Sequence, residues 1–415
     1  MADRAGRSAG LVAGGAAVAA LSGAVFMAIS ARFLTTEQNT GFLTYWAALF
    51  AVFAVLSGIQ NEVTRAVRAD FDGSETERGG TSPLWAGTLV GAVAAVVVLL
   101  LFPAWQVVLT GLDDRLAPVL LIALAALLYA GHVASVGTLA GLGRWPGFAG
   151  LTATESLVRL GLAAVAAVAG WAVVGLEVAA AGGTATWLAA TLLLPRWRFL
   201  WRIRIALPPG ALLRRIANAM AAAGASALLI TGFPLLMSAT TDSAAFTDAA
   251  PLVVAVSMTR APLLLPVTAF QSMVIAAFVG HPDRARSSLI RLVAAVLAVA
   301  VVGGALAAAV GPWLMRLVFG PSYGNSSLVL ALLVVAAASL ALLVLGGSVA
   351  LALDAHTVNT GGWYVALLVS IGLMLIPADL GTRTILALTL GPLAGSAVHF
   401  AFVIRALNRR VVKEA

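Results

Sequence analysis

One arginine lies inside a long apolar stretch, where a charge is expensive. Residues 249–279 read AAPLVVAVSMTRAPLLLPVTAFQSMVIAAFV, and Arg260 is their single ionisable residue. The stretch exceeds the roughly 20 residues that cross a bilayer as a helix. A helical rise of about 1.5 Å per residue places Arg260 roughly 16 Å from its start. A cation at that depth costs about 2.5–3.5 kcal/mol on insertion scales, and it is usually tolerated where it faces protein or a water-filled cavity.

Two prolines follow this arginine closely. Pro262 and Pro266 would bend or break a helix and free its backbone carbonyls. Transporters build sites for anionic groups from broken membrane helices of this kind. Arg260 is therefore predicted to bind an anionic group. The alternative is a structural arginine that reaches an interface or pairs with a carboxylate only for packing.

A second pair of charges lies in another apolar stretch, residues 148–170. Glu155 and Arg159 are four residues apart, so a helix places them on one face, with Arg159 near mid-membrane. In one interpretation they neutralise each other, as paired charges inside membranes do. In the other, Arg159 is a second cation on a shared cavity. Glu155 is then its counter-ion or a coupling site for H⁺ or Na⁺.

Two further polar groups end apolar stretches. Asn61, Glu62 and Arg65 lie at the end of the second stretch and form either a solvated cytoplasmic helix end or the mouth of a cavity. Arg32 closes the first stretch, and it lies either at the interface or on the cavity wall.

Other candidate sites for chemistry are weaker. Asp113 and Asp114 could bind a metal or act as a base in a membrane glycosyltransferase, but their loop is too short to build a substrate-binding domain. The histidines lack metal-ligand spacing; they are His132, His281, His356 and His399. No nucleotide-binding loop occurs, so the sequence gives no sign of ATP use. We expect no cofactor beyond a coupling ion.

Composition sets the class of protein that must position these residues. The chain has 415 residues, of which 61% are hydrophobic and 10% charged, against about 25% charged in soluble domains. This predicts an all-α polytopic membrane protein and argues against a nucleic-acid partner. Cysteine is absent, which excludes disulfides and thiol chemistry.

The apolar stretches predict about 12 transmembrane helices. They fall at 10–34, 41–62, 83–104, 117–141, 148–170, 172–195, 212–238, 249–279, 288–312, 326–353, 361–378 and 383–405. With these spans, 19 of the 25 basic residues fall on one side and four on the other. The positive-inside rule then places both termini in the cytoplasm and the chain in the cytoplasmic membrane.

A basic, aromatic segment divides the spans equally. Residues 196–210 read RWRFLWRIRIALPPG, which is typical of a segment at the membrane interface that meets anionic lipid. We therefore predict lobes at 1–195 and 212–405, each of six helices, joined by a linker at 196–211 and followed by a tail at 406–415. Lobes with six spans each share one orientation in the membrane, which predicts a cleft between them.

Three segments resemble one transporter superfamily. ISARFLTTEQNTGFLTYWAALF (29–50) resembles the opening of polysaccharide-exporter-type flippases, TRAPLLLPVTAFQSMVIAAF (259–278) is similar to their eighth span, and PWLMRLVFGPSYGNSS (312–327) to the exit of their ninth. The chain thus resembles the multidrug/oligosaccharidyl-lipid/polysaccharide exporter superfamily over essentially its whole length. The likeness implies two six-helix lobes that work by alternating access.

The resemblance also implies a substrate. Such flippases move a polyprenyl-diphosphate-linked saccharide from the inner to the outer leaflet, and cationic residues of their cavity meet the diphosphate. Arg260, Arg159 and Arg32 are the matching candidates here. Further expected partners are membrane lipid and cell-envelope glycosyltransferases or a polymerase.

Three alternatives stay open at the level of sequence. A drug or cation antiporter of the same fold would depend on Glu155, although that branch commonly carries an acidic residue in its first span and residues 10–34 have none. A membrane glycosyltransferase would use Asp113 and Asp114. A non-transporting scaffold would dock through the linker.

Overall fold

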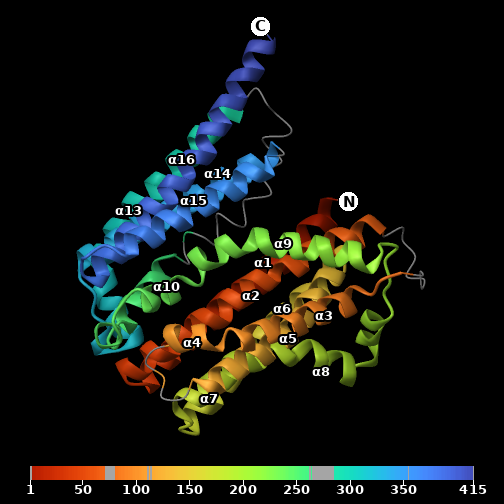
Figure 1. Cartoon of the computed structure of the whole chain (residues 1–415), viewed down its shortest axis with the longest axis horizontal. Helices are drawn as coiled ribbons and strands as arrows, with labels where there is room; N and C mark the ends of the chain where they lie inside the picture. Colours follow the sequence, from red (N-terminus) through yellow and green to blue (C-terminus); the bar gives the residue numbers. More distant parts are fainter. Residues whose placement is uncertain are drawn as a thin grey trace. The chain divides into compact units, whose positions relative to one another are not determined.

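The computed structural model describes residues 2–70, 80–109, 112, 115–260, 263, 285–353 and 355–414. Over these ranges the regular secondary structure is helical, apart from an isolated β-bridge between Thr81 and Ile205. This confirms the predicted all-α class. Figure 1 shows the helices in chain order.

Contacts divide the chain into two compact units, Met1–Ala239 and Thr240–Ala415. The helices of the first unit are α1 (Ala2–Phe33), α2 (Thr36–Asp70), α3 (Pro83–Leu100), α4 (Phe102–Val108), α5 (Leu116–Gly141), α6 (Trp145–Val168), α7 (Ala172–Gly182), α8 (Thr186–Leu193), α9 (Pro209–Ile230) and α10 (Phe233–Ala239), with short 3-10 segments η1 (Gly183–Ala185) and η2 (Pro195–Trp201). Those of the second are α11 (Ser243–Phe246), the helix Ala250–Arg260, α13 (Ala285–Phe319), η4 (Pro321–Tyr323), α14 (Ser327–Ala352), α15 (His356–Met374) and α16 (Leu380–Glu414).

Length and hydropathy fit a multi-pass membrane protein. In the described ranges ten helices are long and apolar enough to cross a membrane, and the bent pair of α9 and α10, which meet at 67°, raises the number to eleven. The predicted eighth span, 249–279, is described as a helix over Ala250–Arg260, and most of the rest lies outside the described residues.

Local sequence explains where several helices begin and end. Ser82 accepts a hydrogen bond from the Trp85 amide, with Pro83 in the first turn of α3. Ser326 caps α14 in the same way through the Val329 amide. Such caps satisfy amides that lack partners inside the helix.

The helix α2 forms the centre of the first unit. The helix α9 packs along α2 (Figure 1). At their crossing, a Cβ on Gly58 would lie 2.6 Å from the Met220 backbone nitrogen, so this close approach requires glycine. Because of this packing, α9 and α10 belong to the first compact unit. The predicted lobes, 1–195 and 212–405, stay a prediction. A compact unit is defined by contacts within the chain, whereas a transport lobe is a part that moves as one body during transport.

The predicted linker is attached to the first unit. Leu200 is buried, Ile205 pairs with Thr81, and the guanidinium carbon of Arg144 lies 4.2 Å from the centre of the Phe199 ring. The linker's start is a short 3-10 helix, η2.

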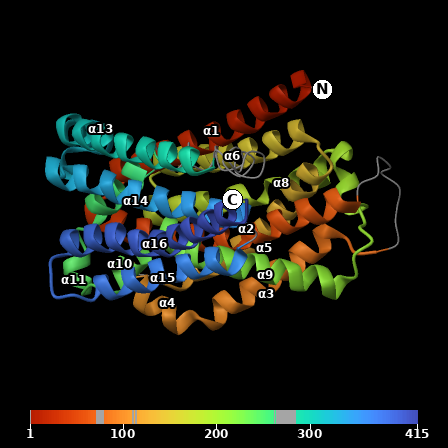
Figure 2. The same ribbon diagram turned by 90° about the horizontal axis from the view of Figure 1, so that it is seen from above.

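In the second unit, α14 packs between α13 and α16, and α15 packs on α16. Figure 2 shows these helices lying side by side. His399 of α16 is buried, and its Nε2 lies 3.1 Å from the Asn359 carbonyl oxygen. Gly346, Gly347 and Gly362 leave the space that this ring occupies, because a Cβ on any of them would approach the ring within 3.3 Å.

Candidate functional site

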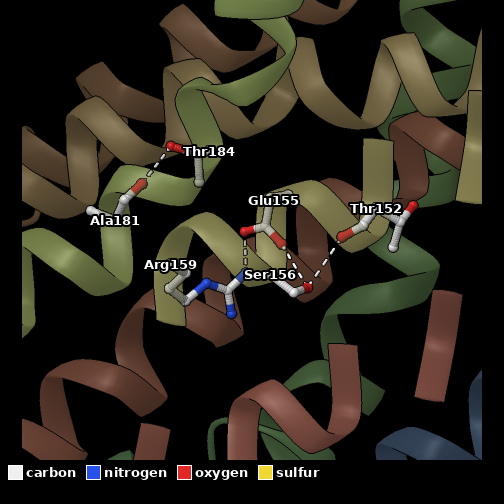
Figure 3. A network of polar contacts seen from close by, with 6 residues as sticks. All are labelled: Thr152, Glu155, Ser156, Arg159, Ala181 and Thr184. Atoms are coloured by element: carbon white, nitrogen blue, oxygen red, sulfur yellow. Dashed lines mark hydrogen bonds and ion pairs between the residues drawn. The ribbon is translucent and has the colours of Figure 1, made fainter. Parts of the chain in front are cut away.

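A buried polar cluster of the first unit lies on α6. Arg159 donates from Nη2 to Oε1 of Glu155, one turn earlier on the helix. Glu155 also accepts from the Ser156 hydroxyl at 3.2 Å, and that hydroxyl lies 3.2 Å from the Thr152 carbonyl oxygen. Figure 3 shows this network. Glu155 is 5% and Arg159 is 9% exposed, so the ion pair is shielded from solvent.

Aromatic rings of α2 surround the guanidinium. Its central carbon lies 4.8 Å from the centre of the Phe50 ring and 5.9 Å from that of Trp46. Both distances are within the roughly 6 Å over which a cation is attracted to a ring face. The Arg159 Nε has no hydrogen-bond partner within the described ranges. The guanidinium therefore holds a buried N–H group that no hydrogen bond of the described residues satisfies.

A glycine lets a neighbouring segment approach the pair. A Cβ on Gly183 of η1 would lie 2.6 Å from the Glu155 carbonyl oxygen and 3.0 Å from its Oε1. Beside it, Thr184 donates its hydroxyl to the Ala181 carbonyl oxygen at 2.7 Å (Figure 3). Gly183 therefore lets η1 lie directly against Glu155.

A second aromatic wall comes from α5. The Tyr129 ring stacks on Phe53 at 4.0 Å and on His132 at 5.8 Å, measured between ring centres. His132 is buried, and its Nδ1 has no hydrogen-bond partner in the described part of the chain. Glu155 and Arg159 act electrostatically on both Tyr129 and His132. The ion pair on α6 therefore lies near a tyrosine and a buried histidine of α5.

Arg260 lies in the second unit, at the end of the helix Ala250–Arg260. Its side chain is buried, with 6% exposed. Pro262 and Pro266, which the sequence predicts to break this segment, lie outside the described residues.

The remaining predicted site residues of the first unit fall at helix ends. Arg32 is exposed in the last turn of α1, and Asn61 is exposed on α2. Glu62 is buried, with 3% exposed. It accepts from Arg65 Nη2 at 2.5 Å, and Arg215 Nη1 of α9 lies 3.9 Å away from its other oxygen.

Arg215 is the functional candidate that sequence reasoning missed. The sequence shows it only as one of several basic residues near the linker. Its contact with Glu62 depends on the packing of α9 along α2, which brings together residues 153 positions apart. One feature of the sequence could have indicated this contact. Glu62 ends an apolar stretch, and a buried carboxylate there needs a cation beside it.

No metal site is apparent among the described residues, which contain no group of three His, Cys, Asp or Glu side chains suited to a metal. Asp113 and Asp114, on which the glycosyltransferase alternative depends, lie outside the described residues.

Solved structures show what the fold resembles. A multidrug-resistance MATE family transporter of the MOP superfamily, in an inward-facing conformation, aligns with a TM-score of 0.71 and 14% identity over 94% of this chain and 95% of that one. A MOP superfamily transporter from Pyrococcus furiosus, described as having a binding pocket of reverse polarity, aligns with a TM-score of 0.66 and 15% identity over 97% and 95%. The fold is therefore that of MOP superfamily transporters, which accords with the predicted superfamily.

Two relatives found by sequence are more similar to this chain than those structures are, and both are uncharacterised. No protein-family profile matches the chain. The uncharacterized protein Rv1510 of Mycobacterium tuberculosis strain H37Rv is 36% identical over 399 residues, covering 94% of this chain and 90% of its own. The uncharacterized protein Rv3630 of the same strain is 35% identical over 412 residues, covering 96% and 94%. The chain belongs to the family of these mycobacterial proteins.

Proposed function

We propose that the protein translocates a polyprenyl-diphosphate-linked saccharide from the inner to the outer leaflet of the cytoplasmic membrane by alternating access. The observation that carries the proposal is the presence of a buried arginine on an apolar helix in each compact unit, Arg159 and Arg260. A diphosphate is anionic, and guanidinium groups bind it through charge-assisted hydrogen bonds. The transporter fold supports transport as the activity.

The ion pair on α6 suggests how binding could be coupled to an ion. Without substrate, Glu155 satisfies Arg159. A diphosphate that binds Arg159 competes with this carboxylate. The displaced carboxylate, buried beside His132 and Tyr129, would then favour uptake of a cation, because an isolated buried charge is costly. Substrate binding and H⁺ or Na⁺ binding thereby support each other at one site.

Arg32 has a lesser role in this proposal. It is exposed at the end of α1, where it meets the diphosphate only at the end of the translocation path.

No covalent chemistry is required. The lipid chain remains in the bilayer while the saccharide crosses in a polar environment.

A drug or cation antiporter is the second candidate, favoured by the buried acidic side chains Glu155 and Glu177. It predicts that Glu155→Gln abolishes export of lipophilic cations. The fold accommodates pockets of different polarity, since one structural neighbour is described by the reverse polarity of its pocket.

Lipid analysis after depletion of the protein in its native cell tests the proposal. We expect a polyprenyl-diphosphate saccharide to accumulate in the cytoplasmic leaflet, which would also identify the sugar. Unchanged amounts and sidedness of all glycan lipids, in a strain without a second flippase, would contradict it.

A further inference from the structure

The linker carries a basic surface that the proposed transport mechanism does not use. Residues 195–208 contain four arginines and no acidic residue. All four arginines are exposed: Arg196, Arg198, Arg202 and Arg204. The hydrogen bonds that Arg198 and Arg204 donate within the described ranges go to backbone carbonyl oxygens. No carboxylate of those ranges forms an ion pair with any of the four. The linker therefore presents positive charge that the described part of the chain does not neutralise.

Hydrogen bonds fix the backbone of this segment on the first unit. Thr81 and Ile205 exchange backbone hydrogen bonds of 3.1 and 3.0 Å. The Thr81 hydroxyl donates to the Leu207 carbonyl oxygen at 2.7 Å, and the Ala206 amide donates to Oδ2 of Asp70 at 3.2 Å. The arginines therefore lie on a backbone that is held in place, which limits how far their spacing can change.

The neighbouring side chains place this segment at a membrane boundary. Directly before it, the three leucines at 192–194 are exposed, and Leu193 is 76% exposed. Such a run of exposed apolar side chains is expected to contact lipid chains. Trp201 of the linker is 42% exposed, and Trp85, in the first turn of α3 four residues after Thr81, is 50% exposed. Tryptophan concentrates at the level of the lipid headgroups, so the arginines beside these rings lie at that level too.

We propose that this linker surface is a binding site for the headgroups of anionic phospholipids, in the leaflet predicted to be cytoplasmic. Guanidinium groups bind phosphate through charge-assisted hydrogen bonds, and clusters of about four to eight basic residues beside a membrane span bind anionic lipid. The exposed tryptophans favour a lipid surface over an acidic protein as the partner. Because the backbone is held, anionic headgroups bind here more tightly than at other exposed arginines of the chain. This binding does not depend on what the protein transports.

Native mass spectrometry of the full-length protein, released from vesicles with equal amounts of phosphatidylglycerol and phosphatidylcholine, tests this proposal. We expect the unaltered protein to retain phosphatidylglycerol several-fold more than phosphatidylcholine. Arg202→Gln with Arg204→Gln should reduce this enrichment several-fold. Arg202→Lys with Arg204→Lys should keep most of it, because lysine retains the charge. The unfolding transition of each variant shows whether it is folded.

A control with the same change in charge separates a site from general attraction. Arg291→Gln with Arg405→Gln removes two exposed arginines of the second unit, and it should leave the enrichment nearly unchanged. An equal loss in this control would overturn the proposal, because the lipid would then respond to net charge alone. Unchanged enrichment in the folded Arg202→Gln, Arg204→Gln variant would also overturn it. If that variant were nevertheless inactive in cells, the surface would be assigned to a protein partner instead.

Discussion

Arg159 and Glu155 form a buried ion pair one turn apart on α6, within cation–π distance of Trp46 and Phe50. Such a pair is expensive to break, because removal of one partner leaves the other charge buried without compensation. The pair therefore makes each residue necessary for the other's burial, and a substrate that binds Arg159 has to replace this carboxylate.

The first prediction concerns stability. Glu155→Leu is expected to lower the free energy of unfolding by about 3–5 kcal/mol, because Arg159 would remain buried without its carboxylate. The double change Glu155→Leu with Arg159→Met removes both charges, so it should cost much less. Denaturant unfolding in detergent micelles measures both. Equal losses for the single and the double variant would show that the pair is not coupled.

The second prediction concerns the wall beside this pair. Gly183→Ala is expected to destabilise the protein by about 1–3 kcal/mol, the usual range for overpacking, because the added Cβ meets the Glu155 backbone. Gly161→Ala on α6 is the matched control, since a Cβ there meets nothing within 4 Å. Its loss should be absent, or replaced by a gain of up to about 1 kcal/mol from helix propensity. Thermal unfolding of both variants checks this, and similar melting temperatures would contradict the close approach.

Hydropathy and local spacing predicted much of this fold. The apolar stretch 117–141 became α5, Leu116–Gly141, and the spacing of Glu155 and Arg159 correctly indicated one helix face. Contacts between distant segments could not be predicted, because no short-range sequence pattern encodes them. The ion pair between Arg215 and Glu62, and the stacking of Tyr129 on Phe53, depend on how α2 packs against α9 and α5.

Prolines show the limit of local rules. The predicted third span ran from 83 to 104, but α3 ends at Leu100 and α4 begins at Phe102, with Pro103 in its first turn. The predicted ninth span ended at 312, yet α13 continues through Pro312 to Phe319. Proline in a first helical turn costs nothing, whereas an interior proline requires neighbours that tolerate the lost hydrogen bond. Sequence does not reveal which case applies.

The third prediction concerns the basic cluster on α2 and α9. Glu62→Gln removes the carboxylate that competes for Arg65 and Arg215. If this cluster is the mouth of the cavity, the change should increase binding of the proposed polyprenyl-diphosphate-linked saccharide, while Arg65→Ala should decrease it. Native mass spectrometry of the protein with added polyprenyl-diphosphate saccharide measures both directions. Weaker binding by a folded Glu62→Gln variant would contradict a role of this cluster in substrate binding.

The fourth prediction concerns ion coupling. In vesicles that carry a pH or Na⁺ gradient, Glu155→Gln is expected to make substrate translocation independent of the gradient. The physical reason is that the amide cannot exchange a proton or hold a cation. Transport that keeps its full dependence on the gradient would place the coupling site elsewhere.

The central claim is that buried arginines carry an anionic substrate across the membrane. The most direct measurement is translocation of a fluorescent polyprenyl-diphosphate saccharide in proteoliposomes by Arg260→Ala, Arg260→Lys and Arg159→Lys, each shown to be folded by its unfolding transition. We expect Arg260→Ala to abolish translocation, and both lysine variants to retain part of it, because lysine keeps the charge but loses the bidentate geometry of guanidinium. Full translocation by a folded Arg260→Ala variant that also carries Arg159→Lys would contradict the account.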